Sequence, residues 1–143
     1  MPDDPILAEL LEACRQDHQA WINGDGSRYE LPEEGTILGA VGGFGRGGVE
    51  TAERQRAVAA QWRRGTGTIE YLNGGRDGEV AWLTFIERSR VELTTDPEGT
   101  ERRWDLRVTE IFNEADGGWR RIHRHADPLV DRHSLADVAS ILR

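Results

Sequence analysis

The sequence predicts a single α+β domain in which N-terminal helices pack on a curved, mainly antiparallel sheet. Helical periodicity dominates residues 1–65, whereas residues 66–127 contain strand patterns separated by tight turns. Such turns join antiparallel neighbours, because parallel neighbours need long crossover connections. Helices followed by a run of hairpins are typical of the α+β class. A chain of 143 residues has the size of one domain, so we expect residues 1–143 to share one core.

The helical part, residues 1–65, is expected to contain two helices and one short strand. Asp4 is the expected N-cap of the first helix, with Pro5 at its first position. Its apolar side recurs at helical spacing and ends before a run of Asn and Gly that stops helices: Leu7, Leu11, Cys14, His18 and Trp21. A strand over residues 35–41, a glycine-rich loop over 42–48 and a helix from Thr51 to Arg64 are expected to follow.

The sheet part, residues 66–127, is expected to be a meander of four strands with tight connecting turns. The expected strands are residues 66–72, 79–93, 101–113 and 119–126. We expect a sheet of four to six strands in all. A C-terminal helix is expected over residues 133–143, because Ser134 and Asp137 resemble a capping box.

Composition excludes several classes of function. The net charge of −8 argues against a nucleic-acid partner, because phosphate binding needs clustered positive charge. The chain has no lysine, which excludes Schiff-base chemistry and a Walker-A site. Cys14 is the single cysteine, so no internal disulfide or multi-thiolate zinc site can form. No apolar run approaches the ~20 residues of a membrane span, and we expect a cytoplasmic protein with no membrane contact.

Two glutamates on the apolar face of the expected sheet are the candidate catalytic residues. Side chains alternate along a strand, so Glu110 shares a face with Trp104, Val108 and Phe112, and Glu87 shares one with Phe85. A three-residue loop over 115–117 would pair Glu110 with Ile122 and place Arg124 diagonally opposite. One glutamate would stay ionised beside Arg124 and act as a base, and the other would have a raised pKa and donate a proton. The alternative is an ion pair that serves structure alone.

Aromatic side chains indicate a core that also suits a pocket for a flat or alicyclic ligand. With Arg124, the expected ligand-binding residues are Trp21, Tyr29, Trp62, Phe85 and Trp104. Their roles in the core and in a pocket are both open at this point.

Three other patterns give weaker indications of a functional site. His123, His125 and Asp127 lie on one side of a strand, but nothing in their spacing demands a metal, and we expect none. The run Gly43-x-Gly45-x-x-Gly48 matches a dinucleotide fingerprint, but a hairpin meander follows it and the fingerprint needs a parallel βαβ unit. Ser89 and the other serines lack an elbow motif and an evident histidine partner.

The segment from Arg107 to Pro128, with Leu38 to Phe44 and Trp82 to Arg88, resembles the SnoaL-like, ketosteroid-isomerase-like branch of the nuclear transport factor 2-like superfamily. The resemblance implies a conical, cystatin-like roll around an apolar pocket, with no cofactor. It also implies a homodimer through the convex face of the sheet, where we expect four residues to gather: Trp82, Arg107, Ile111 and Trp119.

Function varies within this superfamily, so the resemblance leaves two classes open. One is a cofactor-independent acid–base enzyme of isomerase, cyclase, dehydratase or epoxide hydrolase type, acting on a small hydrophobic molecule through Glu110 and Glu87. The other is a non-catalytic ligand-binding or dimeric association domain. The chain departs from the isomerases of the superfamily because it has no Tyr-plus-Asp oxyanion pair in their positions.

Overall fold

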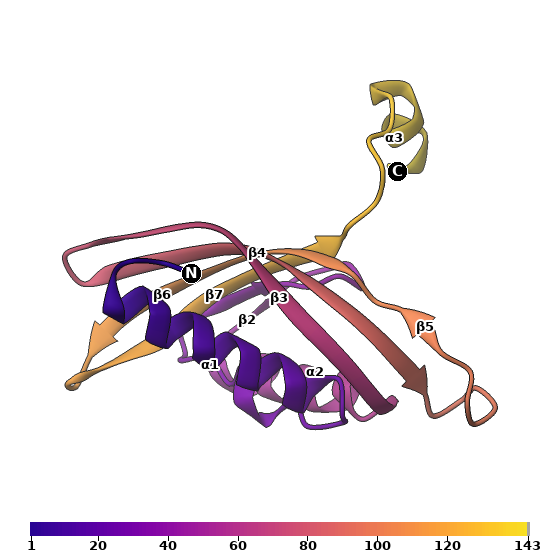
Figure 1. The fold of residues 1–143 in the computed structure, drawn as a ribbon, viewed down its shortest axis with the longest axis horizontal. Helices are drawn as coiled ribbons and strands as arrows, with labels where there is room; N and C mark the ends of the chain where they lie inside the picture. Colours follow the sequence, from indigo (N-terminus) through magenta and orange to yellow (C-terminus); the bar gives the residue numbers. More distant parts are fainter. Residues whose placement is uncertain (143) are drawn as a thin grey trace.

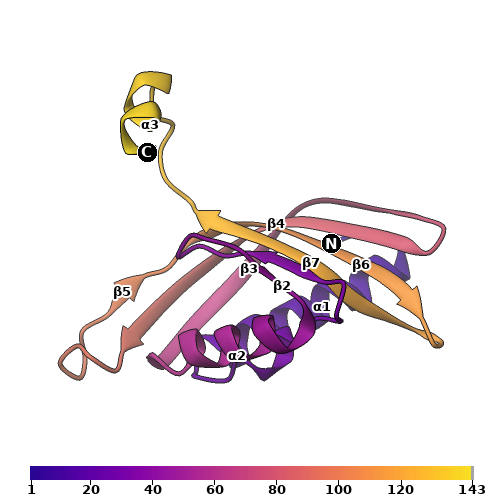
Figure 2. The ribbon, with the colours of Figure 1, turned by 180° about the vertical axis from the view of Figure 1, so that it is seen from behind.

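The computed structural model describes residues 1–142 and confirms the α+β fold, with helices on the concave face of one curved sheet (Figure 1). Helices α1 (Pro5–Trp21) and α2 (Gly48–Ala59) and the short 3-10 turn η1 (Ser27–Tyr29) form the helical layer. The same arrangement is visible from behind, where α2 lies below the middle of the sheet (Figure 2).

The sheet has the strand order β2-β1-β7-β6-β4-β3, and β5 pairs with β4 beside this path. Its strands are β1 (Thr36–Leu38), β2 (Gly45–Arg46), β3 (Trp62–Asp77), β4 (Val80–Leu93), β5 (Arg102–Arg103), β6 (Leu106–Ala115) and β7 (Gly118–Pro128). Only β1 and β7 are parallel; every other pair of neighbours is antiparallel.

The sheet has seven strands, more than the four to six expected, for two reasons. The glycine-rich loop contains β2, which pairs with β1. The expected strand over residues 101–113 is divided into β5 and β6, because the side chain of Asp105 accepts a hydrogen bond from Ser89 N in place of a backbone carbonyl (3.1 Å).

The second helix was placed too late in the sequence. It begins at Gly48 and ends at Ala59, whereas Thr51 to Arg64 was expected. Thr51 is not its N-cap: the Thr51 hydroxyl lies inside the helix and donates to the carbonyls of Gly47 and Gly48. Trp62 is therefore the first residue of β3 and does not belong to the helix.

The last hairpin differs from expectation in both its turn and its register. Its turn has two residues, Asp116 and Gly117, which both have positive φ (53° and 79°) as two-residue hairpins favour. Further along, a bulge between Ile111 and Phe112 inserts one extra residue, Ile122, on β7. Glu110 consequently lies opposite Arg124 and not opposite Ile122.

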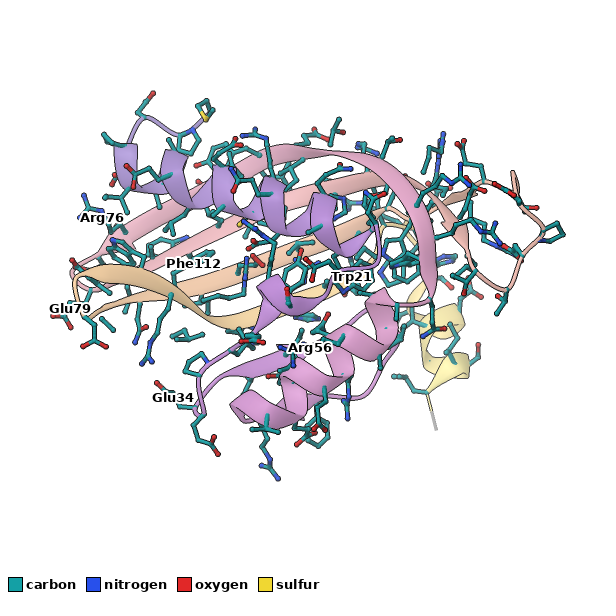
Figure 3. All side chains as sticks on the ribbon, turned by 90° about the horizontal axis from the view of Figure 1, so that it is seen from below. Trp21, Glu34, Arg56, Arg76, Glu79 and Phe112 are labelled. Carbon is teal, nitrogen blue, oxygen red and sulfur yellow. The ribbon has the colours of Figure 1, made fainter. Side chains whose placement is uncertain are left out.

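The core has two parts on the concave side. The larger one joins the buried face of α1 to strands β3, β4, β6 and β7. The smaller one contains three tryptophans, Trp21, Trp62 and Trp104, whose ring centres lie 5.2–6.4 Å apart. Figure 3 shows Trp21 at the C-terminal end of α1 and Phe112 toward the opposite end of the sheet.

The C-terminal helix α3 (Leu135–Ile141) begins at Ser134, whose hydroxyl accepts from Asp137 N as the capping pattern predicts. It buries none of its residues and stands away from the sheet on the side opposite α1 and α2 (Figures 1 and 2). None of the helices within residues 1–142 is long and apolar enough to cross a lipid bilayer.

Gly67→Ala tests the packing of α1 on the sheet. A Cβ atom at Gly67 would lie 2.8 Å from His18 Nε2 and 2.9 Å from Ser89 Oγ, both buried, whereas one at Gly118 would meet nothing within 4 Å. We expect Gly67→Ala to lower the free energy of unfolding by about 1–3 kcal/mol through overpacking. Chemical denaturation measures this; a change no larger than that of Gly118→Ala would contradict the packing described.

Candidate ligand site beside a buried charge cluster

Five charged side chains from α1, β4, β6 and β7 meet on the concave side of the sheet, and together they are called the charge cluster below. The cluster contains three carboxylates and two guanidinium groups, all from residues at most 8% exposed: Asp17, Glu87, Glu110, Arg121 and Arg124. Charges this deeply buried must be paired and hydrogen-bonded, because an isolated one costs many kcal/mol.

The bulge in β7 brings both arginines inside. Strict alternation along β7 would place Arg121 and Arg124 on opposite faces of the sheet. The two-residue turn pairs Arg121 with Phe112, so Arg121 points inward. The extra residue Ile122 then shifts the alternation, so that Arg124 points inward as well. Arg120, which lies between Trp119 and Arg121, is exposed.

Each glutamate is held by an arginine with two or more contacts. Arg121 Nε donates to both carboxylate oxygens of Glu110 at 2.9 Å, and Arg121 Nη2 donates to Asp17 at 2.6 Å. Arg124 donates to both oxygens of Glu87 at 2.9 and 3.1 Å, and its Nη1 also reaches Glu110 at 3.2 Å. Arg124 therefore bridges the two glutamates, which favours a fixed geometry.

Tyr29 lies between the two guanidinium groups. The centre of its ring is 4.9 Å from Arg121 Cζ and 4.8 Å from Arg124 Cζ, so it contacts both as a cation–π partner. Arg121 also donates to the carbonyl of Arg28, one residue earlier. The turn η1 is thereby attached to the sheet through the charge cluster.

The pKa of Glu87, which lies beside Arg124, is below its ordinary value. Burial alone raises this pKa, but Arg124 and His18 beside the carboxylate outweigh the effect of burial. Glu87 is therefore ionised at neutral pH. The Sγ of Cys14 donates a further hydrogen bond to Glu110 (3.3 Å).

His18 contacts Ser89 and Glu87 in the order found in serine hydrolases. Its Nε2 lies 2.8 Å from Ser89 Oγ, and its Nδ1 lies 3.5 Å from Glu87 Oε1. Ser89 thus has the histidine partner that sequence analysis did not find. All three residues are at most 3% exposed, and the charge of Glu87 is already matched by Arg124. The arrangement therefore fixes α1 to β4 and presents no nucleophile to a substrate.

A pocket opens next to the charge cluster, between α2, β1 and the ends of β6 and β7. Its cavity volume is ≈ 50 Å³, room for roughly four water molecules. Its lining is mostly apolar with a few polar side chains: Trp21, Tyr29, Ile37, Val41, Phe44, Arg54, Gln55, Val58, Trp104, Leu106, Arg124 and Ala126 are among its residues.

The structure brings some of the expected site residues to this pocket and leaves others out. Arg124, Tyr29, Trp21 and Trp104 line it. Trp62 and Phe85 do not line it; both lie in the core, in the small and large clusters respectively. Glu87 and Glu110 also do not line it, because Arg124 stands between them and the pocket.

Several contributors to the site were missed in the sequence. Asp17 and His18 lie on the buried face of α1, and a charged residue on an apolar helix stripe was the available signal. Arg121 had no signal, because the sequence does not show whether the last hairpin turn has two residues or three. Gln55 and Arg54 come from α2; Gln55 accepts from Trp21 Nε1 (2.9 Å) and so orients the indole at the pocket wall.

The polar residues considered for a metal site contact other side chains, and the glycine run does not form a dinucleotide site. The Nδ1 of His123 lies 2.8 Å from Thr36 Oγ1, and Asp127 accepts both hydrogen bonds of Arg107. Within residues 1–142 no group of three His, Cys, Asp or Glu side chains is placed to hold a metal ion. The glycine run lies at the pocket rim, and β2 and β3 on either side of α2 are at opposite edges of the sheet, so no βαβ unit forms.

The convex face differs from expectation at one residue. Trp82, Ile111 and Arg107 occupy it, and Trp82 is 39% exposed. Trp119 pairs with Glu114 and packs against the large core cluster on the concave side. The two-residue turn pairs Trp119 with Glu114 and so places the Trp119 side chain on the concave face of the sheet.

No family profile and no curated protein sequence matches the chain. Many solved structures do. The chain has the fold of nuclear transport factor 2-like proteins. It is similar to a superfamily protein of this name from Salmonella enterica serovar Typhimurium (TM-score 0.74, 16% identity, 90% of this chain and 94% of that one).

Two further structures show the range of proteins with this fold. One is an uncharacterised protein with a cystatin-like fold from Caulobacter vibrioides (TM-score 0.64, 19% identity, 96% of this chain and 93% of that one). The other is the CaMKII hub homology domain from Chlamydomonas reinhardtii (TM-score 0.66, 17% identity, 87% and 98%). At these identities the likeness establishes the fold and not the function.

Glu110→Gln tests whether the charge cluster stabilises the fold. The substitution keeps the shape of the side chain but replaces the carboxylate that accepts from Arg121 and Arg124 with a neutral amide, while Asp17 and Glu87 still pair with the two arginines. We expect a loss of about 1.5–3 kcal/mol in the free energy of unfolding, the usual cost of a lost hydrogen bond to a charged group. The exposed Glu12→Gln is the control, with an expected change within about 0.5 kcal/mol. A loss below about 1 kcal/mol for Glu110→Gln would contradict the account.

His18 should make stability depend on pH just below neutrality. Burial holds the pKa of His18 below its ordinary value of 6.5, so between these two values the unfolded chain binds a proton that the folded chain does not. Stability should therefore fall as pH decreases below 6.5, by at most about 1.4 kcal/mol per pH unit.

Denaturation at pH 7.5, 6.5 and 5.5 measures this slope. In His18→Gln the dependence of stability on pH should be smaller. The remaining slope should come from His123, whose pKa is also lowered by burial. The exposed His133→Gln should leave it unchanged. An unaltered slope in His18→Gln would show that His18 is not the group responsible.

Proposed function

We propose that this protein is a small-molecule-binding domain that uses the pocket beside Arg124 and assembles as a homodimer. The ligand is small and largely apolar, with one oxygen acceptor such as a carbonyl or carboxylate group. The observation that carries this proposal is Arg124 itself, which lines an otherwise mostly apolar pocket and is fixed from behind by Glu87 and Glu110.

Preorganisation supports binding at this position. The guanidinium group of Arg124 makes its protein hydrogen bonds through Nη1 and Nη2 and contacts the ring of Tyr29. Because the Arg124 side chain is already ordered, a ligand that binds to it avoids the entropic cost of immobilising a long side chain, which is about 0.5–1.5 kcal/mol. Trp21 and Trp104 are stacked on each other and supply a flat apolar wall for such a ligand.

The same geometry favours binding over acid–base catalysis by the two glutamates. A general base must come within hydrogen-bond reach of the proton it removes. Neither Glu87 nor Glu110 lines the pocket, and both already accept hydrogen bonds from arginine. A proton transfer would have to displace Arg124 from between the carboxylates and the ligand.

Self-association is supported by the convex face. Leu72, Val80 and Trp82 are 55%, 43% and 39% exposed there, called the convex patch below. Apolar patches of this kind mark interfaces more often than free surface. The association domain of CaMKII from Caenorhabditis elegans is also among the similar structures, which agrees with this proposal.

Filling the pocket should abolish binding. Val58 lines the pocket and is half-buried, whereas the adjacent Ala57 is exposed on α2. We expect compounds from a panel of small carbonyl and carboxylate molecules to raise the melting temperature and to quench Trp21 and Trp104 fluorescence. Val58→Phe should lose both responses, and Ala57→Phe should keep them. Equal responses in the two variants would contradict the location of the site, and catalytic turnover without stabilisation would favour an enzyme.

A further inference from the structure

The segment after β7 exposes several large apolar side chains. We call residues 129–142 the C-terminal arm. Its exposed large apolar residues are Val130 (59%), Leu135 (86%), Val138 (43%), Ile141 (75%) and Leu142 (74%). The arm is attached to the body where Leu129 N donates to the carbonyl of Asp105 (2.9 Å).

The arm has no stabilising partner within its own chain. Helix α3 has seven residues, and helices shorter than about 12–15 residues are marginal in water unless they pack on something. Leu135, Val138 and Leu142 recur at intervals of three and four, which places them along one side of the helix. That side covers nothing in the structure, so it has the pattern of a docking surface without its partner.

We propose that the arm of one chain docks on the convex patch of a second copy. The proposal rests on the homodimer proposed above and adds the element that completes its interface. Figures 1 and 2 show that the arm leaves the sheet on the side opposite α1 and α2, which is the convex side, where a second copy would lie.

The position of the convex patch agrees with a two-fold arrangement. Val80 and Trp82 lie near the β3–β4 turn, whereas Pro128, from which the arm begins, pairs with Leu106 at the other end of β6. When two sheets meet face to face with strands running in opposite directions, the Pro128 end of one lies over the Val80 end of the other. Each arm then meets the partner's patch, as an isologous interface requires.

The linker has the length to make this contact. Residues 129–134 separate β7 from α3, and six extended residues span at most about 20 Å. Two stacked sheets lie about 10 Å apart. The arm can therefore cross from its own sheet to the face of the second one with its helix intact.

Sedimentation velocity on full-length variants tests the proposal. Leu135→Asp with Val138→Asp should weaken the dimer at least tenfold, because both side chains on the docking side of α3 lose their apolar contact. Ala136→Asp with Ser140→Asp adds the same charge to the other side of α3 and should leave the dimer unchanged. Equal dimer affinity in the two double variants would overturn the role of the arm while leaving the homodimer in place. A wild-type chain that is monomeric at 100 μM would overturn both.

Disulfide trapping identifies which copy the arm contacts. A tagged Val80→Cys chain mixed with an untagged Leu135→Cys chain should give a crosslinked heterodimer, since native Cys14 is buried. Glu53→Cys, exposed on α2, replaces Val80→Cys as the control and should crosslink much more slowly. Equal rates with the control would overturn the proposal, as would a monomeric crosslink in the Val80→Cys/Leu135→Cys double variant that forms in preference to the heterodimer.

Discussion

Two arginines that must be neutralised inside the molecule impose the main constraint on this structure. Arg121 and Arg124 are both at most 8% exposed, and their charges are met by Glu110, Glu87 and Asp17. Leaving one of these charges unmatched costs several kcal/mol, a large part of the 5–15 kcal/mol that stabilises a typical domain. The elements that carry the five groups are therefore fixed relative to one another.

That constraint connects the helical layer, the sheet and the pocket. Asp17 joins α1 to β7 through Arg121, and Tyr29 joins η1 to β7 by contacting both guanidinium groups. His18 joins α1 to β4 through Ser89. Arg124 is the member that also reaches the pocket, so the network that stabilises the fold holds the polar group that would meet a ligand. Pocket geometry and stability are thus difficult to change separately.

The fold class could be predicted from the sequence because hairpin turns and helical periodicity are local signals. The face of Glu110 and Glu87 also follows from alternation along uninterrupted strands, and both lie buried on the concave side. Arg121 could not be predicted as a partner of Glu110, because the two-residue turn places Arg121, and not Arg120, on the concave face. Trp119 was misplaced for a related reason, since its side depends on whether the turn has two residues or three. The sequence also does not predict that α3 buries none of its residues, because its apolar spacing is that of a helix that packs on another element.

The central claim is that the charge cluster holds Arg124 in place and does not supply a proton. A ¹³C NMR titration of the Glu87 carboxyl group tests it most directly, because the carboxyl carbon reports ionisation at that residue alone. The account predicts a midpoint below the ordinary glutamate value of about 4.3, since Arg124 and His18 outweigh the effect of burial. A midpoint above that value, approaching neutrality, would contradict the account and make Glu87 a proton donor.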